Sequence, residues 1–356
     1  MKWNRFFYLP LSTLYFALIA GCGLPAGLVP LPPSLRDLPQ IDNAGILLAS
    51  KTVKIKEAPN AFNGSLTRDP DSANYLLVTR YDESSIFGWI CPNRFLGVVG
   101  LNADFEEIPG SFAKLKNRSQ MAQDPTAIVT GNDIFFTHDD NAPFSTIRAV
   151  YGALLAKPYN SGDLINRRRY KGPIKGRIEK SWIPFIYTPP GGTPEVMLLY
   201  SSSPMVVYQE NQIAAGNTKP FSVCKQKLSW PHGRIRGGSP ALLIDNEYLA
   251  FFHSSFSSGG AYWYVMGAYT FESKPPFCAI KISQHPILFS SLYDTPLSEL
   301  APPDRRVIFP RGLVFEERNG KKLLQVSAGV NDSAVKIFTF DYEKFMSTLI
   351  KISAPQ

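Results

Sequence analysis

The stretch RGGSPALLIDNEYLAFFHSS, residues 236–255, carries the pattern that decides the fold. It begins with Arg236 on a Gly-Gly-Ser-Pro turn, and an apolar run leads from there to a polar turn at Asp245 and Asn246. A second apolar run follows and ends at His253. Two apolar runs joined by a two-residue polar turn predict a β-hairpin, with the arginine and the histidine at opposite ends.

The same pattern occurs five times along the chain, in residues 62–82, 123–140, 179–204, 236–255 and 309–332. The polar residues that start these hairpins are spaced 61, 55, 57 and 75 residues apart: Asn63, Asp124, Glu179, Arg236 and Arg311. Two strands cannot bury an apolar face, so each interval is expected to hold a second hairpin and to form a four-stranded sheet.

Five such sheets predict an all-β fold, a five-bladed β-propeller filling residues from about 40 to 350. No long segment shows apolar residues at helical spacing. A β-sandwich or two separate β domains is the alternative, but the repeats run to the C-terminus without a break in composition. In a propeller the innermost strands face a central channel, so the five polar starts are expected to meet at one mouth, with His253 on the same or the adjoining rim.

The composition indicates a globular protein with many turns. Of 356 residues, 44% are hydrophobic and 19% charged, and 30 prolines and 26 glycines fall mostly between short apolar runs. The formal charge is +8, or +6 without Lys2 and Arg5. The densest basic stretch, residues 166–180, would suit nucleic acid or anionic lipid, but no nucleic-acid motif accompanies it and a solvated loop is favoured.

The N-terminus reads MKWNRFFYLPLSTLYFALIAGCG, with a short basic start and an apolar run over residues 6–20. This run is shorter than the about 20 residues of a membrane span, and it suits a secretory signal. Residues 19–22, Ile-Ala-Gly-Cys, resemble a bacterial lipobox, in which the thiol of Cys22 carries the lipid. Ordinary cleavage or an uncleaved anchor is the alternative.

The predicted organisation is therefore a signal peptide over 1–22, a proline-rich tether over 23–40 and the propeller over 41–356. The expected location is the bacterial cell envelope, lipid-anchored in the periplasm or outer membrane, or secretion. If Cys22 is acylated, Cys91, Cys224 and Cys278 remain, which allows at most one disulfide. Their spacing fits no metal site, so neither a metal nor a cofactor is expected.

The order of five motifs resembles the five-bladed propellers of glycoside hydrolase family 130, the β-mannoside phosphorylases and related mannosidases. QDPTAIV (123–129) resembles that family's Glu-Asp-Pro-Arg segment, and EKSWIPF (179–185) its Lys-Asn-Trp segment. YLAFFHSS (248–255) resembles its Tyr-His-Gly strand end, and residues 264–288 its Gly-Ala stretch before Pro-Ile-Leu. VIFPRGLVF (307–315) and SAGVND (327–332) resemble its closing Phe-Pro-x-Gly and Tyr-Gly-x-x-Asp pair.

The chain departs from the family at several motif positions. Gln123 and Thr126 replace the charges that flank the aspartate, Ser181 replaces the asparagine, and Ala328 replaces the closing tyrosine. These changes are compatible with a different substrate or with lost catalysis, and they put phosphorolysis in particular doubt.

Inverting glycoside cleavage needs two groups on opposite faces of the sugar, typically ~6.5–9.5 Å apart. Asp124 is the first candidate, since the resemblance implies an acid that relays its proton through a sugar hydroxyl; the alternative is an ordinary turn aspartate before proline. Glu179 is the second catalytic candidate, as an acid or a hydrogen-bonding residue, with a surface ion pair to Lys180 as the alternative.

Five residues are expected to bind substrate: Asn63, Trp182, Arg236, His253 and Asp332. Arg236 and His253 would hold an anion or hydroxyl groups, and Trp182 would stack on a sugar ring. The resemblance matches Asp332 to the family's closing, sugar-binding aspartate. Core packing is the alternative for His253 and Trp182, and a turn role for Asp332.

The sequence thus favours a secreted or envelope-anchored carbohydrate-active enzyme that cleaves or phosphorolyses a glycoside, best a β-mannoside. The expected partners are a carbohydrate, inorganic phosphate and the membrane through a lipid anchor, with no nucleic acid. A catalytically silent glycan-binding or partner-binding propeller lipoprotein is the alternative. There is no Gly-x-Ser-x-Gly elbow and no Gly-Lys phosphate loop, and histidines and cysteines are too sparse for a zinc cluster.

Overall fold

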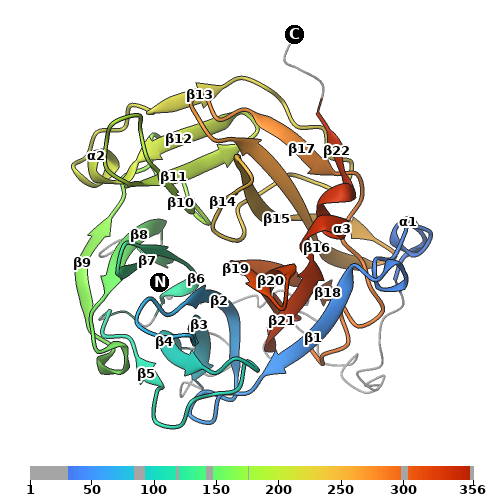
Figure 1. The fold of residues 1–356 in the computed structure, drawn as a ribbon, viewed down its shortest axis with the longest axis horizontal. Helices are drawn as coiled ribbons and strands as arrows, with labels where there is room; N and C mark the ends of the chain where they lie inside the picture. Colours follow the sequence, from blue (N-terminus) through green and yellow to red (C-terminus); the bar gives the residue numbers. More distant parts are fainter. Residues whose placement is uncertain are drawn as a thin grey trace, which may run out of the picture. The chain divides into compact units, whose positions relative to one another are not determined.

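Five antiparallel sheets stand side by side around a common centre (Figure 1). The computed structural model describes residues 31–83, 93–117, 119, 121–141, 147–174, 176–297 and 304–352. The predicted signal peptide with Cys22, and also Cys91, lie outside the described residues. The sheets are numbered here as blades I to V, and the five-bladed β-propeller predicted from the hairpin repeat is confirmed.

Blades I to III each contain four strands that follow one another along the chain. Blade I consists of β2 (Ala61–Arg68), β3 (Tyr75–Glu83), β4 (Asn93–Leu101) and β5 (Ala113–Lys114). Blade II consists of β6 (Gln123–Thr130), β7 (Asp133–Asn141), β8 (Arg148–Leu155) and β9 (Leu164–Arg169). Blade III consists of β10 (Ile183–Tyr187), β11 (Glu195–Ser202), β12 (Met205–Gln209) and β13 (Ser222–Cys224).

Blade IV takes in two strands from elsewhere in the chain, and blade V takes in one. Blade IV consists of β14 (Leu242–Ile244), β15 (Glu247–Ser258), β16 (Ala261–Glu272) and β17 (Ala279–Ser283), with β22 (Leu349–Lys351) beyond β17 and β18 (Arg305–Arg306) beside β16. Blade V consists of β19 (Ile308–Arg318), β20 (Lys321–Val330), β21 (Ala334–Asp341) and β1 (Leu47–Val53). The strand nearest the N-terminus thus completes the last blade and closes the ring by backbone pairing (Figure 1).

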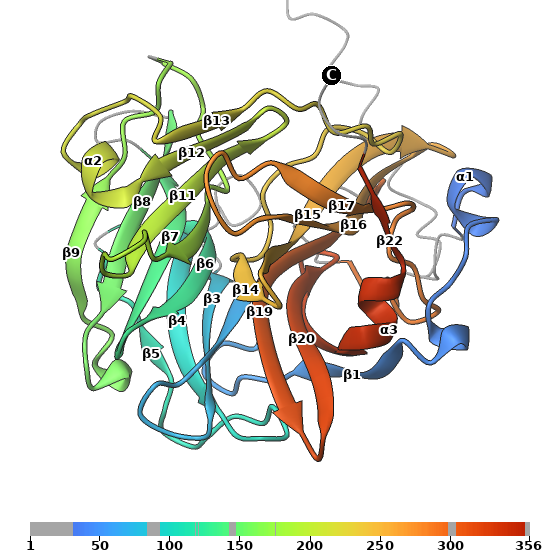
Figure 2. The same ribbon diagram turned by 45° about the horizontal axis from the view of Figure 1, so that its top comes forward.

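Helices are few and short among the described residues: α1 (Pro33–Arg36), α2 (Glu210–Ala214), α3 (Tyr342–Ser347) and the 3₁₀ turns η2 (Asp42–Ala44) and η3 (Tyr159–Ser161). None of them is long and apolar enough to cross a membrane. Figure 2 shows α3 between β20 and β22, at the point where the chain passes from blade V back to blade IV.

The hairpin of residues 236–255 forms as the sequence predicts, with one difference. Asp245 and Asn246 have φ values of 48° and 68°, the left-handed pair that a two-residue hairpin turn requires. Arg236 and His253 exchange backbone hydrogen bonds, N–H to O, of 2.9 and 3.3 Å. His253 therefore lies within β15 rather than at its end, directly across from Arg236.

The core lies between neighbouring blades, and it takes in part of the segment predicted as a tether. Leu35 in α1 has 0% exposure and packs into the cluster shared by blades IV and V, which includes Phe251 and Phe340. The packed unit accordingly begins at Leu31. A disulfide joins Cys224 in blade III to Cys278 beside β17 of blade IV, so the single disulfide that the cysteine count allowed is formed by these two.

The basic stretch 166–180 forms the end of β9 and the loop that follows it. Arg167 pairs with Asp140 of blade II at 2.6 Å, and Arg168 lies 3.8 Å from Glu210 in α2 of blade III, so acidic groups of both blades neutralise part of the charge. The last residues of the stretch, from Arg177 onward, line a cavity at the mouth of the propeller.

Candidate active site at the mouth of the propeller

Local backbone geometry sets the direction of the polar residues that start the inner strands β2 and β6. The register slips between Phe62 and Ser65 in β2, and between Gln123 and Thr126 in β6. At these bulges Asn63 and Asp124 have φ values of 50° and 55°, a left-handed conformation that costs non-glycine residues of order 1–3 kcal/mol. Such strain is typical of functional sites, where neighbouring structure holds it in place.

Asp124 is the centre of a buried polar group. Its Oδ1 accepts a 2.8 Å hydrogen bond from Asn63 Nδ2 and lies 3.7 Å from Arg80 Nη1. Arg311 donates to the backbone carbonyls of Asp124 and of Pro125. Burial raises the pKa of Asp124, but the charges of Arg80 and Arg311 outweigh it and hold that pKa below its usual value. Asp124 is therefore ionised at neutral pH.

Arg80 is a site residue that the sequence analysis missed. It binds Asp82 through two hydrogen bonds of 2.9 and 2.7 Å, and its guanidinium lies 4.3 Å from the ring centre of Phe62. Its charge also acts on Asp332. The pKa of Asp332 is raised overall, because the effect of burial is larger than the opposing effect of the Arg80 charge. The signal in the sequence was an arginine two residues after the apolar run of β3, at a position that alternation would bury.

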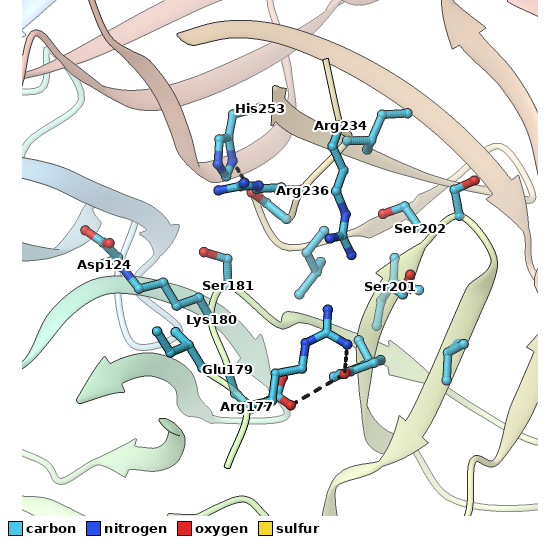
Figure 3. A pocket seen from close by; sticks show the side chains of 18 of the residues that line it. Asp124, Arg177, Glu179, Lys180, Ser181, Ser201, Ser202, Arg234, Arg236 and His253 are labelled. Atoms are coloured by element: carbon cyan, nitrogen blue, oxygen red, sulfur yellow. Dashed lines mark hydrogen bonds between the residues drawn. The ribbon is translucent and has the colours of Figure 1, made fainter. Parts of the chain in front are cut away.

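A cavity of about 580 Å³ opens beside Asp124 (Figure 3). Four cationic side chains line it, from two segments that face each other: Arg177, Lys180, Arg234 and Arg236. Its carboxylates are Asp124 and Glu179, and its aromatic lining residues are Tyr200, Tyr264 and Phe309. The cavity is thus rich in positive charge, and the Lys180 side chain extends toward Asp124 (Figure 3).

His253 also lines the cavity, but in a neutral form. Burial lowers the pKa of His253 to about 3, and its Nδ1 lies 2.6 Å from the carbonyl oxygen of Gly237. A carbonyl can only accept, so Nδ1 carries the proton and Nε2 is left as an acceptor. His253 can accept a hydrogen bond from a ligand hydroxyl; the expectation that it holds an anion by charge does not fit this state.

Glu179 and Trp182 pack against each other. The Glu179 carboxylate accepts from Trp182 Nε1 and from the Tyr200 hydroxyl, both at 3.4 Å, and burial raises the pKa of Glu179. Trp182 has 1% exposure and stacks between Tyr170 and Tyr208, at 5.8 and 5.9 Å between ring centres. The prediction that Trp182 stacks on a sugar is corrected, because neither face of its ring is open.

The structure thus brings the five polar strand starts together. Asn63 and Arg311 contact Asp124, and Glu179 and Arg236 line the same cavity as Asp124. Arg311 lies beneath the site with 1% exposure rather than at its surface. Asp332 belongs to the group through its electrostatic coupling to Arg80 and Asp124.

Asp139 is a second residue that the sequence analysis missed. It is buried in β7, and its Oδ1 accepts a 3.0 Å hydrogen bond from the backbone N–H of Ser181. Burial, together with the charge of Asp124, raises the pKa of Asp139 to about 7. No group of three or more His, Cys, Asp or Glu side chains in the described residues is placed to hold a metal ion.

No protein-family model matches the chain, and no curated protein sequence matches it. Solved structures match it in three dimensions. One is from the GH130 family of mannoside phosphorylases, described as containing glycoside hydrolases that target β-1,2 mannosidic linkages in Candida mannan. It is 13% identical with a TM-score of 0.57, over 80% of this chain and 85% of that one.

Two further structures cover slightly more of the chain. A mannose phosphorylase from Leishmania mexicana in complex with a phosphate ion is 15% identical with a TM-score of 0.56, over 89% of this chain and 96% of that one. A β-1,2-mannobiose phosphorylase from Listeria innocua is 12% identical with a TM-score of 0.54, over 86% and 97%. At these identities the likeness concerns the fold: the chain has the five-bladed β-propeller found in the GH130 mannoside phosphorylases.

Proposed function

We propose that the protein is a carbohydrate-active enzyme that cleaves a β-mannoside at the mouth of the propeller. The observation that carries the proposal is the placement of Asp124 between a buried polar group and a cationic cavity wall. Asn63, Arg80 and Asp332 offer donors and acceptors beside Asp124 that suit the hydroxyl groups of one sugar ring. One neighbouring structure comes from a family described as containing hydrolases that target β-1,2 mannosidic linkages, and another is a β-1,2-mannobiose phosphorylase, which supports this substrate class.

The cationic wall favours inorganic phosphate as the attacking group. Lys180 and Arg236 line the cavity together with Asp124, and a guanidinium offers paired donors to phosphate oxygens. The phosphate ion bound to the Leishmania enzyme of the same fold supports this choice. Thr126 stands where the family has an arginine, and it contributes no charge. The four cations that line the cavity would therefore have to supply all of the positive charge that binds phosphate.

The test is the release of mannose and of mannose 1-phosphate from β-1,2-mannobiose, with and without inorganic phosphate. We expect phosphate-dependent formation of mannose 1-phosphate. Formation of free mannose alone would show hydrolysis instead. Binding of the disaccharide by calorimetry without any turnover would support a silent glycan-binding propeller, the candidate that the loss of the flanking charges at Gln123 and Thr126 favours.

Arg236→Gln is expected to raise the KM for phosphate by about 10–100-fold, the equivalent of one charge-assisted hydrogen bond of about 1.5–3 kcal/mol, with a smaller effect on kcat. The matched control is Lys171→Gln, because Lys171 is an exposed cation of the basic stretch that does not line the cavity. Initial rates at varied phosphate concentration measure both. Equal KM values for the two variants would contradict a phosphate role for Arg236.

We also infer that the protein is exported and lipid-anchored through Cys22. The lipobox-like residues 19–22 support this, and so does the disulfide between Cys224 and Cys278, since disulfides persist in oxidising compartments. Cys22→Ala is expected to release the protein from membranes or to block its processing, as measured by fractionation and intact mass. Unchanged membrane association and unchanged mass would contradict the anchor.

A further inference from the structure

Asp139 occupies an unusual position for a carboxylate. It is paired across the sheet with Gln123, the neighbour of Asp124, and it has 1% exposure. Ser181 N–H is the donor to its Oδ1, while its Oδ2 is buried and finds no hydrogen-bond partner among the described residues. A buried oxygen that lacks a donor is far less costly on a neutral carboxyl group than on an ionised one.

Asp124, by contrast, is surrounded by groups that stabilise a negative charge. Asn63 donates to its carboxylate, Arg80 lies 3.7 Å away, and Arg311 lies beneath its backbone. Each of these two buried carboxylates makes the ionisation of the other less favourable, so one proton is retained and goes to the less stabilised partner.

The charges that face Asp139 come from three elements. Asp124 on β6 opposes its ionisation, while Lys180 before β10 and Arg311 on β19 favour it. Both cations also act on Asp124, where Arg80 adds a third positive charge. The balance therefore places the negative charge on Asp124 and the proton on Asp139.

We propose that Asp139 holds the proton of an Asp124–Asp139 pair at neutral pH, and that it is a positioning residue which supplies Asp124 with a proton during cleavage. The pKa of Asp139, raised to about 7 by burial and by Asp124, agrees with this assignment. The catalytic half of the proposal rests on the proposed function; the protonation of Asp139 in the free protein does not.

The proton balance of the step is simple. The bond between the anomeric carbon and the leaving oxygen breaks, and that oxygen takes the proton that Asp124 relays through a sugar hydroxyl. An oxygen of hydrogen phosphate forms the new bond to the anomeric carbon. The proton that Asp124 relays is the one that the Asp124–Asp139 pair holds, and the proton that hydrogen phosphate loses when it becomes the sugar phosphate replaces it. No proton is gained or lost overall.

A direct titration tests where the proton lies without requiring activity. The carbonyl stretching band of protonated carboxyl groups is followed by infrared spectroscopy from pH 4 to 9. We expect wild type to lose one such band with a midpoint near pH 7, Asp139→Asn to lack that band, and Asp133→Asn, at the exposed start of the same strand, to keep it. Asp124→Asn should move the midpoint to lower pH, because it removes the neighbouring negative charge.

Persistence of the band in folded Asp139→Asn would overturn the assignment, as would a wild type with no titration above about pH 5. The substitution is close to isosteric and keeps the acceptor for Ser181 N–H, so the fold is expected to survive. If that variant does not fold, an unchanged midpoint in Asp124→Asn would overturn the coupled pair, and a lowered midpoint would support it.

The catalytic half is tested by the pH dependence of kcat/KM. In wild type, kcat/KM should fall above about pH 7. In Asp139→Asn this fall should begin at least one pH unit lower, and kcat at pH 7 should be reduced by at least about tenfold. Asp133→Asn should leave the profile unchanged. An unchanged limb in Asp139→Asn would overturn the proton-supplying role. An inactive wild type that still shows the infrared titration would contradict the proposed function and support the protonation of Asp139.

Discussion

Asp124→Asn is expected to lower the turnover of a β-mannoside by about 10²–10⁴-fold, the usual contribution of a general acid, while the protein stays folded. The amide keeps an oxygen for the hydrogen bond that Asn63 donates, so the shape of the site is retained while the ability to relay a proton is lost. Steady-state rates at saturating substrate measure the effect, because an interaction made only in the transition state lowers kcat.

The control for this substitution is Asp104→Asn, which changes an exposed turn aspartate and should leave turnover unaffected. Full activity of Asp124→Asn, with a far-ultraviolet circular dichroism spectrum like that of wild type, would show that another group supplies the proton. The fold and the cavity would stand in that case, but the assignment of Asp124 would be wrong.

Arg311→Ala is expected to lower the free energy of unfolding by about 3–5 kcal/mol, the range observed when one member of a buried charge network is removed. Arg311 has 1% exposure, donates to the carbonyls of Asp124 and Pro125, and compensates the charge of Asp124. Its loss leaves two buried carbonyls without a donor and a buried carboxylate with less compensation.

Urea unfolding followed by tryptophan fluorescence measures this change, and Arg169→Ala provides the comparison. Arg169 is exposed at the end of β9, so its loss should stay within about 0.5 kcal/mol. Arg311→Met, which keeps much of the apolar volume, should recover only the packing part of the deficit. A change of less than 1 kcal/mol for Arg311→Ala would mean that the channel is organised without it.

The fold could be predicted because its signal is local and repeated. Each inner hairpin carries its own turn and its own apolar runs, as the Asp245-Asn246 turn shows, and the repeat interval leaves room for one further hairpin. The burial of Leu35 could not be predicted in the same way. Proline content suggested a tether, whereas the contacts that bury Leu35 come from residues of blades IV and V that are distant in sequence.

The site was predicted where a motif residue stands at the start of an inner strand or near the end of a recognised hairpin, as His253 and Asp332 do. Asn63 and Asp124 stand at the start of inner strands, and the structure joins them by a hydrogen bond. Arg80 and Asp139 instead lie on the second strands β3 and β7, and they reach the site because the bulges in β2 and β6 shift the register beside them. No local pattern in the sequence records such a shift.

The protonation state of His253 and the enclosure of Trp182 could not be predicted from the sequence either. His253 is neutral because it is buried against the carbonyl of Gly237, and Trp182 is enclosed, with 1% exposure, because Tyr170 and Tyr208 stack against it. Both outcomes depend on neighbours brought together by the blades. The sequence analysis expected ligand contacts from both residues and named core packing as the alternative; packing is what the structure shows for Trp182, and His253 is buried and neutral at the cavity.

A crystal structure after soaking with mannose and inorganic phosphate would show whether a sugar binds beside Asp124 with phosphate against the cationic side chains of the cavity. We expect a sugar whose hydroxyl groups contact Asn63, Arg80 and Asp124, and a phosphate at Lys180 and Arg236. A sugar bound elsewhere on the propeller, or an empty cavity at saturating mannose and phosphate, would contradict this arrangement.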